Sequence, residues 1–199
     1  MTQLSSTHPT SPERRALLAL AALILASAGL PFGADGAQAA TRRELEADGS
    51  AALARLYAMN PKARELAGKS VAIMIFPKIT KVGVLVVGGQ RGDGVLYSRG
   101  KPIGYFRIRS GSVGWQAGGQ TLSYAMFFFT DSGLGYLRKS KGWSIGSGPS
   151  VVIIDKGKAG SMNTTTLQAD VAAIPFGQEG LMAGLGLEGT KIAQISPDP

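Results

Sequence analysis

The residues of this chain that could do chemistry are mainly its lysines and arginines. Lys and Arg together number 21 against 13 Asp and Glu, which gives a formal net charge of +8. Six basic residues fall at the expected turns or strand ends: Lys69, Lys78, Lys81, Arg91, Arg99 and Lys101. Each basic side chain near an anionic bilayer contributes about 1 kcal/mol of attraction, so this set predicts a footprint for anionic lipid. For any single member, a plain solubilising surface is the alternative.

Catalytic side chains are scarce by comparison. The chain has no Cys and one His, His8, which lies in a predicted leader. His is the usual general base, and Cys or His completes most nucleophilic and zinc sites. The acidic residues form no recognisable catalytic signature, and the glycine-rich tracts do not have the spacing of a phosphate loop. We therefore expect a protein that is not an enzyme and that uses no metal or cofactor.

Residues 1–39 have the pattern of an export signal. Arg14 and Arg15 precede the apolar run Ala16–Ala26, and the tract Ala37-Gln38-Ala39 fits a cleavage site. The apolar run is short for a membrane span. The paired arginines fit a twin-arginine signal, and they fit equally the positive segment of an ordinary Sec signal. The pattern predicts export to the periplasm or cell envelope, with no transmembrane span in the mature chain.

The mature chain opens with a helical pattern. Apolar spacing predicts a helix over Thr41–Met59, whose apolar stripe comprises Leu45, Ala52, Leu53, Leu56 and Met59. Asn60-Pro61 predicts a stop and a new helix over Lys62–Ala67. A third, short helix is expected over 134–138, capped by Thr130 or Asp131.

After Gly68 the pattern changes to short extended segments cut by Gly, Pro and polar residues. Strands are predicted over 71–76, 82–87, 94–97, 103–109, 113–117, 122–129, 143–145, 151–155, 167–173 and 181–188. We expect Asp93 in a turn, a buried strand at 126–129, glycines 88–89 and 118–119 in turns or crowded positions, and a frayed tail at 196–199. The fold class is therefore α+β and mostly antiparallel: a compact glycine-rich sheet or partial barrel with N-terminal helices and one or two short helices.

Three stretches carry a family resemblance, and they occur in order. The first runs from Ala67 to Leu96 and contains Gly68-Lys69-Ser70-Val71, Phe76-Pro77-Lys78 and Gly92-Asp93-Gly94. The second is Gly111–Gln120, and the third is Gly180–Gly189. Together they resemble the SYLF domain, a lipid-binding family related to an actin-binding domain of eukaryotic proteins. The resemblance is strongest over 51–195. It implies a single domain over 40–199 that binds membrane lipid, or phosphoinositide-like head groups, without catalysis.

Two hypotheses for function remain open at this point. In the first, Lys69, Lys78, Lys81 and Arg91 cooperate on an anionic bilayer, and the helix over Thr41–Met59 adds apolar contact through Leu45, Leu53 and Leu56. In the second, the protein is a structural envelope component that acts by protein–protein contact, and its charge is incidental. Nucleic acid is not an expected partner, because the basic residues are not interleaved with exposed aromatic residues in a known module.

Overall fold

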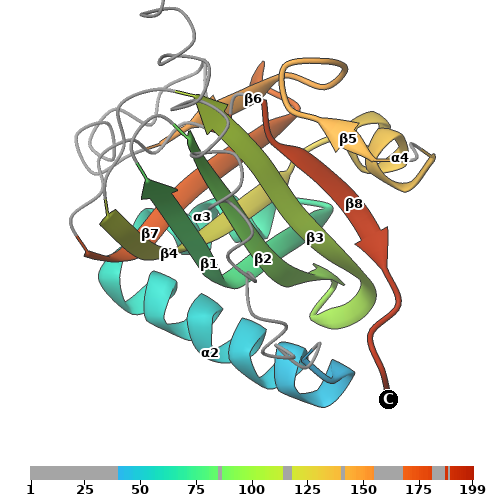
Figure 1. The fold of residues 1–199 in the computed structure, drawn as a ribbon. Helices are drawn as coiled ribbons and strands as arrows, with labels where there is room; N and C mark the ends of the chain where they lie inside the picture. Colours follow the sequence, from blue (N-terminus) through green and yellow to red (C-terminus); the bar gives the residue numbers. More distant parts are fainter. Residues whose placement is uncertain are drawn as a thin grey trace, which may run out of the picture. The chain divides into compact units, whose positions relative to one another are not determined.

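The computed structural model describes residues 40–84, 87–113, 118–139, 142–154, 168–180, 187 and 189–199. The predicted leader lies outside these residues, as do nearly all of the strands predicted over 113–117 and 181–188. The described part contains three helices, α2 (Arg42–Met59), α3 (Pro61–Lys69) and α4 (Asp131–Lys139) (Figure 1). Its strands are β1 (Ala72–Val84), β2 (Val87–Ser98), β3 (Lys101–Val113), β4 (Gly118–Phe128), β5 (Trp143–Ser144), β6 (Val151–Ile153), β7 (Val171–Gly180) and β8 (Lys191–Ile195).

The strands form a single curled sheet in the order β5-β8-β3-β2-β1-β4-β7-β6 (Figure 1). Neighbouring strands pair antiparallel, except that β6 runs parallel to β7. Successive strands β1, β2 and β3 lie side by side, whereas β4 returns to the other edge of β1. The predicted α+β class with a mostly antiparallel sheet is confirmed.

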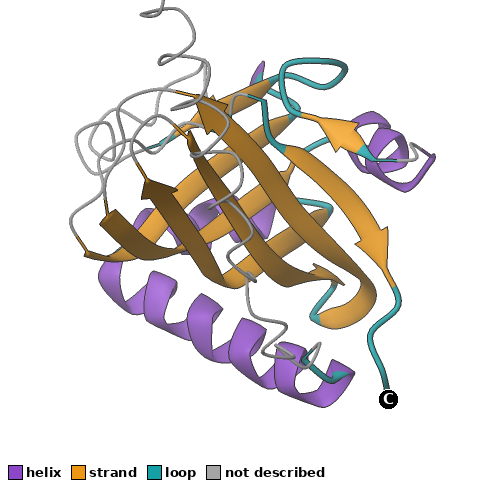
Figure 2. Ribbon diagram, viewed as in Figure 1, coloured by secondary structure: helices purple, strands orange, loops and turns teal. Residues whose placement is uncertain are grey.

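Both faces of the sheet are covered. One face, called here the helix-bearing face, packs against α2 and α3 (Figure 2) and buries Leu56, Leu66, Ile75, Phe127 and Ile174. The opposite face buries a second cluster that includes Met74, Phe76, Phe106, Tyr124 and Trp143. Because β4 is covered on both sides, its residues from Leu122 to Phe128 are all buried. The predicted buried strand around 126–129 is therefore confirmed over 126–128.

Helix α2 is capped at Thr41, the first residue of the predicted helix. The Thr41 side chain accepts a hydrogen bond from the Glu44 backbone N–H at 3.3 Å, and the Glu44 carboxylate accepts one from the Thr41 backbone N–H at 2.8 Å. Gly49 is buried on the helix and faces the sheet. A Cβ at Gly49 would lie 2.9 Å from Tyr97 Oη and 3.1 Å from Ile75 Cγ2. The missing side chain lets α2 approach β1 and β2 closely.

The apolar stripe of α2 differs from the predicted one. Leu45 and Leu56 are 4% and 1% exposed and pack against the sheet, so the expectation that they contact a membrane is wrong. Leu53 is partly buried against the same cluster. Met59 is 60% exposed and does not belong to the buried stripe. Helix α2 therefore buries its apolar side chains against the sheet and presents no continuous apolar face to solvent.

Strand β1 contains a bulge at Pro77, where the sequence predicts a break. Ile75 pairs with Val95, but Lys78 pairs with Asp93, so β1 has one residue more than β2 in this interval. The pairing with β4 is shifted in the same way. A bulge tolerates proline, which has no N–H to donate to the ladder. The Ser123 hydroxyl donates a hydrogen bond to the Pro77 carbonyl at 2.7 Å, so the carbonyl oxygen at the bulge has a hydrogen-bond donor.

Asp93, predicted to lie in a turn, is inside β2. The glycines on either side of it, Gly92 and Gly94, face the bulge of β1. A Cβ at Gly94 would lie 2.4 Å from the Ile75 carbonyl oxygen, and one at Gly92 would lie 2.7 Å from the Lys78 carbonyl oxygen. The single strand predicted over 82–87 is also wrong, because Val84 at the end of β1 pairs with Val87 at the start of β2. Glycine is used here for close backbone contact rather than for turning.

The C-terminal tail is held in place rather than frayed. The Asp198 carbonyl accepts a hydrogen bond from the Arg42 backbone N–H at 3.0 Å. The Pro197 carbonyl accepts one from Arg42 Nε at 3.1 Å, and Pro197 is buried. The end of the chain therefore lies at the start of α2 (Figure 1) and satisfies one of its free backbone donors.

Asp170 joins three elements through one carboxylate. Its Oδ1 accepts a hydrogen bond from the Thr130 hydroxyl at 2.9 Å, and Thr130 caps α4 as predicted by accepting from the Gly133 N–H at 3.1 Å. Its Oδ2 accepts from both the backbone N–H and the hydroxyl of Ser150, each at 2.9 Å. The hydrogen bonds from Ser150 and Thr130 lower the pKa of the Asp170 carboxyl group. The carboxylate links β6, β7 and the start of α4.

We expect Asp170→Asn to lower the melting temperature at pH 7 by about 2–4 °C, because charge-assisted hydrogen bonds worth about 1 kcal/mol are lost. The folded pKa lies below the unfolded value of about 3.9. The contribution of Asp170 to stability is therefore present above that pH and is lost as the pH falls through the folded pKa. Thermal denaturation between pH 7 and pH 2 should show the gap between the two proteins closing below about pH 4. A gap that is independent of pH would contradict this assignment.

Candidate functional site

Three cations lie next to one another across adjacent strands of the helix-bearing face. Arg91 on β2 pairs with Arg109 on β3, and Arg109 pairs with Lys191 on β8. Directly opposed residues have Cβ atoms about 4.5–5.5 Å apart. All three side chains are exposed. We call these three residues the cationic row.

The side chains of the cationic row point to the helix-bearing face because of strand alternation. Val95, two strand positions beyond Asp93, is buried beneath α2, so Arg91 and Asp93 share that side of β2. On β3, Ile108 is fully buried on the opposite face, which places Arg107 and Arg109 on the helix-bearing one. Among the residues that the structure describes, no side-chain hydrogen bond or salt bridge is formed by Arg91, Arg109 or Lys191. Like charges in direct opposition destabilise a sheet, so an anionic ligand would relieve this repulsion.

The neighbouring row, closer to α2, is largely neutralised. Asp93 pairs with Arg107 across β2 and β3, and its carboxylate accepts from both Nε and Nη2 of the guanidinium, the latter at 2.6 Å. The hydrogen bond to Asp93 raises the pKa of Arg107. This fork-to-fork geometry engages both carboxylate oxygens. Asp93, expected in a turn, is thus a strand residue that does not neutralise the cationic row.

Glu46 on α2 is also engaged. The Tyr105 hydroxyl donates to its carboxylate, and the Tyr97 hydroxyl donates to its backbone carbonyl at 3.0 Å. Burial raises the pKa of Tyr97 to about 12, with smaller contributions from Glu46 and Tyr105. These contacts fix the first half of α2 over β2 and β3. The acid is therefore tied to the tyrosines of the sheet.

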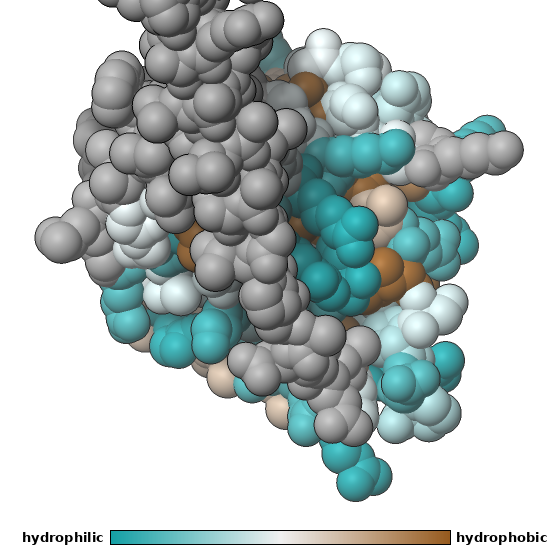
Figure 3. Space-filling view, viewed as in Figure 1, coloured by the Kyte–Doolittle hydropathy of each residue, from teal (hydrophilic) through white to brown (hydrophobic). Residues whose placement is uncertain are grey.

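Next to the cationic row, four adjacent strands of the described part present almost no side chains on the helix-bearing face. The next row of paired residues on the helix-bearing face contains Gly119, Val82, Gly89 and Gly111 in four adjacent strands. Val82 is 47% exposed. A strip of this composition is flat, so an extended surface can approach the cationic row closely. Figure 3 shows hydrophilic residues, in teal, gathered over β3 and β8.

The six predicted basic residues do not form one surface. Arg91 and Lys78 lie on the helix-bearing face, where Arg91 belongs to the cationic row and Lys78 lies in the neighbouring row. Arg99 is in the β2–β3 turn, and Lys101 follows it. At about 3.3 Å per residue, Arg99 lies roughly 25 Å along β2 from Arg91. Lys69 ends α3, just before the same end of β1.

Lys81 faces the opposite side of the sheet. It pairs with Gln90 on β2 and with Gln120 on β4, and both glutamines are buried there. Gln90 Nε2 donates to the Thr190 hydroxyl at 3.3 Å. Lys81 therefore belongs to a polar group at the border of the second core and not to the surface that carries Arg91.

Sequence reasoning missed two members of the cationic row. Arg109 lies in the strand predicted over 103–109, but nothing in the sequence marked it as a neighbour of Arg91. No local sequence pattern indicated that Lys191 belongs to a binding surface. The signal for Arg109 was its alternation with the buried Phe106 and Ile108, which fixes the face but not the partner strand. The pairing itself could not be read from the sequence.

Other kinds of site find little support in the described residues. No group of three or more His, Cys, Asp or Glu side chains among them could hold a metal ion. None of their helices has the length and apolar character needed to cross a membrane. Trp143 is fully buried and donates from its indole N–H to the Ser147 carbonyl at 2.9 Å, so it is a core residue and not part of an exposed surface.

Comparison with known proteins does not assign the chain to a family. No protein-family model matches it, and no curated protein matches it. The SYLF resemblance stays a prediction.

Proposed function

We propose that this protein is an exported, non-catalytic binding protein of SYLF type that attaches to the anionic head groups of a membrane surface. The observation that supports this most directly is the cationic row, Arg91, Arg109 and Lys191, which meets no opposing charge among the described residues. Such an arrangement costs stability, and an anionic surface offsets that cost. Neighbouring strands lie about 4.8 Å apart, so the three cations extend over roughly 10 Å of the surface.

The geometry also suits a surface rather than a single molecule. The row lies beside the strip of Gly119, Val82, Gly89 and Gly111, where few side chains hold an approaching bilayer away. Each cation contributes about 1 kcal/mol at an anionic bilayer. Three cations give about 3 kcal/mol, which is enough for weak, reversible attachment. Insertion of α2 is not part of this proposal, because its leucines are buried against the sheet.

An exposed apolar patch would support the alternative, a structural envelope protein that acts by protein contact. The large exposed hydrophobic residues of the described part are Met59, Val82, Ile103 and Tyr136. They come from α2, β1, β3 and α4, and no two of them are paired across strands. Charge therefore favours the lipid proposal over protein contact.

The test is co-sedimentation of the mature protein with vesicles of phosphatidylcholine alone and with vesicles that also contain phosphatidylglycerol. We expect binding to the anionic vesicles only. Binding should weaken strongly between 0.1 M and 1 M salt, because the Debye length falls from about 10 Å to about 3 Å. Equal binding to both kinds of vesicle, or binding that is insensitive to salt, would contradict the proposal and favour the protein-contact alternative.

A further inference from the structure

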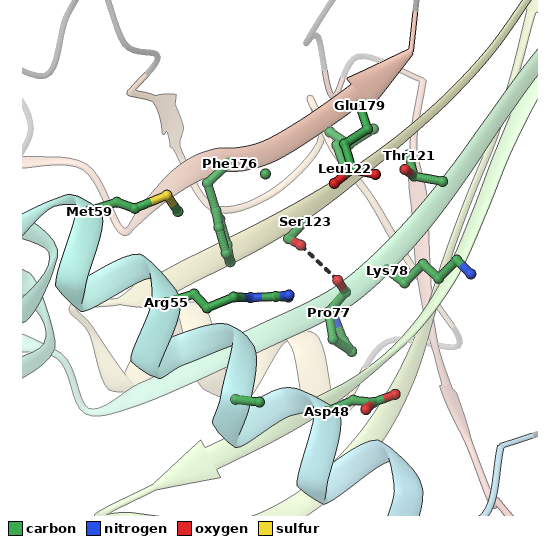
Figure 4. Close-up of a pocket in the computed structure, with 12 residues that line it drawn as sticks. Asp48, Arg55, Met59, Pro77, Lys78, Thr121, Leu122, Ser123, Phe176 and Glu179 are labelled. Atoms are coloured by element: carbon green, nitrogen blue, oxygen red, sulfur yellow. Dashed lines mark hydrogen bonds between the residues drawn. The ribbon is translucent and has the colours of Figure 1, made fainter.

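A pocket of about 450 Å³ opens between α2 and the sheet, and two bulges shape it (Figure 4). One is the bulge of β1 at Pro77. The other is on β7, where Thr121 pairs with Glu179 but Ser123 pairs with Phe176, and where Gly177 has a φ of +60°. Strand β4 therefore has a bulged neighbour on each side at Ser123. Bulges bend a strand and increase its twist, so the sheet is distorted at this point, and residues of α2 line the pocket above it.

The pocket combines an apolar wall with charges of both signs. Phe176 and Leu122 are 4% and 3% exposed, and Met59, which α2 does not bury, lines the same space. The charged lining residues are Asp48, Arg55, Lys78 and Glu179. In the part of the chain that the structure describes, these four form no ion pair with one another. Their formal charges sum to zero, which sets the pocket apart from the cationic row.

Figure 4 shows how these groups are arranged. Arg55 reaches from α2 across the pocket toward Pro77 and Ser123. Asp48 and Glu179 lie at opposite ends, and Lys78 extends outward from the rim. The Ser123 hydroxyl already donates to the Pro77 carbonyl. Arg55 is thus the central donor of the site, with a carboxylate to either side.

We propose that this pocket binds a phosphoethanolamine group, a zwitterion in which a primary ammonium is joined to a phosphodiester by two carbons. The guanidinium of Arg55 would hold the phosphate oxygens with paired hydrogen bonds. The carboxylate of Glu179 would accept hydrogen bonds from the ammonium. Carbon atoms on the other side of the phosphate would pack against Met59 and Phe176. A purely anionic ligand would be repelled by Asp48 and Glu179.

The size of the pocket favours this group over a free amino acid. Pockets of about 300–1,000 Å³ enclose ligands of drug size. At about 450 Å³, the pocket has room for the head group together with the glycerol that carries it. The group could come from a bilayer lipid or from a soluble phosphodiester. Thr121 lines the pocket and also pairs with Thr80, which pairs with Arg91, so the pocket and the cationic row are connected along one row of the sheet.

Isothermal titration calorimetry with glycerophosphoethanolamine tests the proposal on the mature protein. We expect saturable binding, and at least tenfold weaker binding for glycerol 3-phosphate, which lacks the ammonium. Arg55→Gln and Glu179→Gln should each weaken glycerophosphoethanolamine binding at least tenfold. Arg138→Gln, which changes an exposed arginine of α4 that lines neither the pocket nor the cationic row, is the matched control and should leave the affinity unchanged. Both pocket residues are exposed, so their variants should melt like the wild type.

A second arm distinguishes the two sources. Binding is measured on vesicles of phosphatidylcholine with and without phosphatidylethanolamine, both of which carry no net charge. The measurement is made in 1 M salt, which screens the attraction of the cationic row to the membrane. Binding that requires phosphatidylethanolamine and is lost in Arg55→Gln assigns the lipid as the source, whereas binding of the soluble compound alone assigns a soluble phosphodiester. No heat with glycerophosphoethanolamine, or equal affinity in wild type and Arg55→Gln, overturns the proposal. The proposed function of the cationic row would still stand in that case, because its test uses phosphatidylglycerol.

Discussion

Reversal of Arg91, Arg109 and Lys191 to Glu should weaken binding to vesicles that contain phosphatidylglycerol by more than 100-fold. Removing three attractions of about 1 kcal/mol each accounts for about 3 kcal/mol, and a factor of ten corresponds to about 1.4 kcal/mol. Three new negative charges at the same place add repulsion. The measurement is co-sedimentation at 0.1 M salt over a series of lipid concentrations.

The chain offers a control with the same change of net charge. Reversal of Lys69, Arg99 and Lys101 to Glu also alters three exposed cations, but these lie at the other end of β1 and β2. If the cationic row is the contact surface, this control should lose only a small part of the affinity through the general field of the protein. Equal losses in the two triple variants would show that net charge, and not the row, determines binding. The opposite order would assign the lipid contact to the β2–β3 turn.

The second large effect concerns the fold itself. Gly94→Ala should destabilise the protein by about 2–3 kcal/mol, because overpacking of a close contact has costs of this order. The new Cβ would meet the Ile75 carbonyl oxygen at 2.4 Å and Phe76 Cδ1 at 2.5 Å, and the bulge at Pro77 fixes both. At about 2–4 °C per kcal/mol, the melting temperature should fall by roughly 4–12 °C.

Gly111→Ala is the matched control for this change. Gly111 is also a strand glycine, but a Cβ there would meet no atom within 4 Å. Its substitution should change the free energy of unfolding by less than about 0.5 kcal/mol. Urea denaturation of the three proteins gives the comparison. If Gly94→Ala melts like Gly111→Ala, then β1 and β2 are not held in close contact at the bulge.

The sequence by itself determined the local elements and the fold class. Thr41 with Glu44 marks the start of α2, Asn60-Pro61 separates α2 from α3, and Thr130 caps α4, each through contacts that span only a few residues. Runs of β-branched and aromatic residues cut by glycine predicted the mostly antiparallel sheet. These signals are readable because the groups that interact are neighbours along the chain.

The tertiary structure decided what the glycines and the proline do. Asp93 and its neighbour Gly92 read as part of a turn in the sequence, yet Gly92 lies in a strand opposite the bulge of β1. Pro77 reads as a strand break, yet β1 continues through it. The hydroxyl of Ser123, forty-six residues away, donates a hydrogen bond to the Pro77 carbonyl at this point. A glycine that turns the chain and a glycine that admits a neighbouring backbone have the same local sequence. Only the position of the partner strand separates the two roles.

The tertiary structure also decided which cations form the cationic row. Alternation along β3 fixes the face of Arg109, but its neighbours depend on how β2, β3 and β8 pair. Arg91 and Lys191 are one hundred residues apart, and Arg109 stands between them only in the folded sheet. The register of these strands is set by burial of Ile108 and Ile192 on the opposite face, since a shift by one residue would expose them and bury the cations. Local sequence determines which side chains are charged, and core packing determines which of them meet.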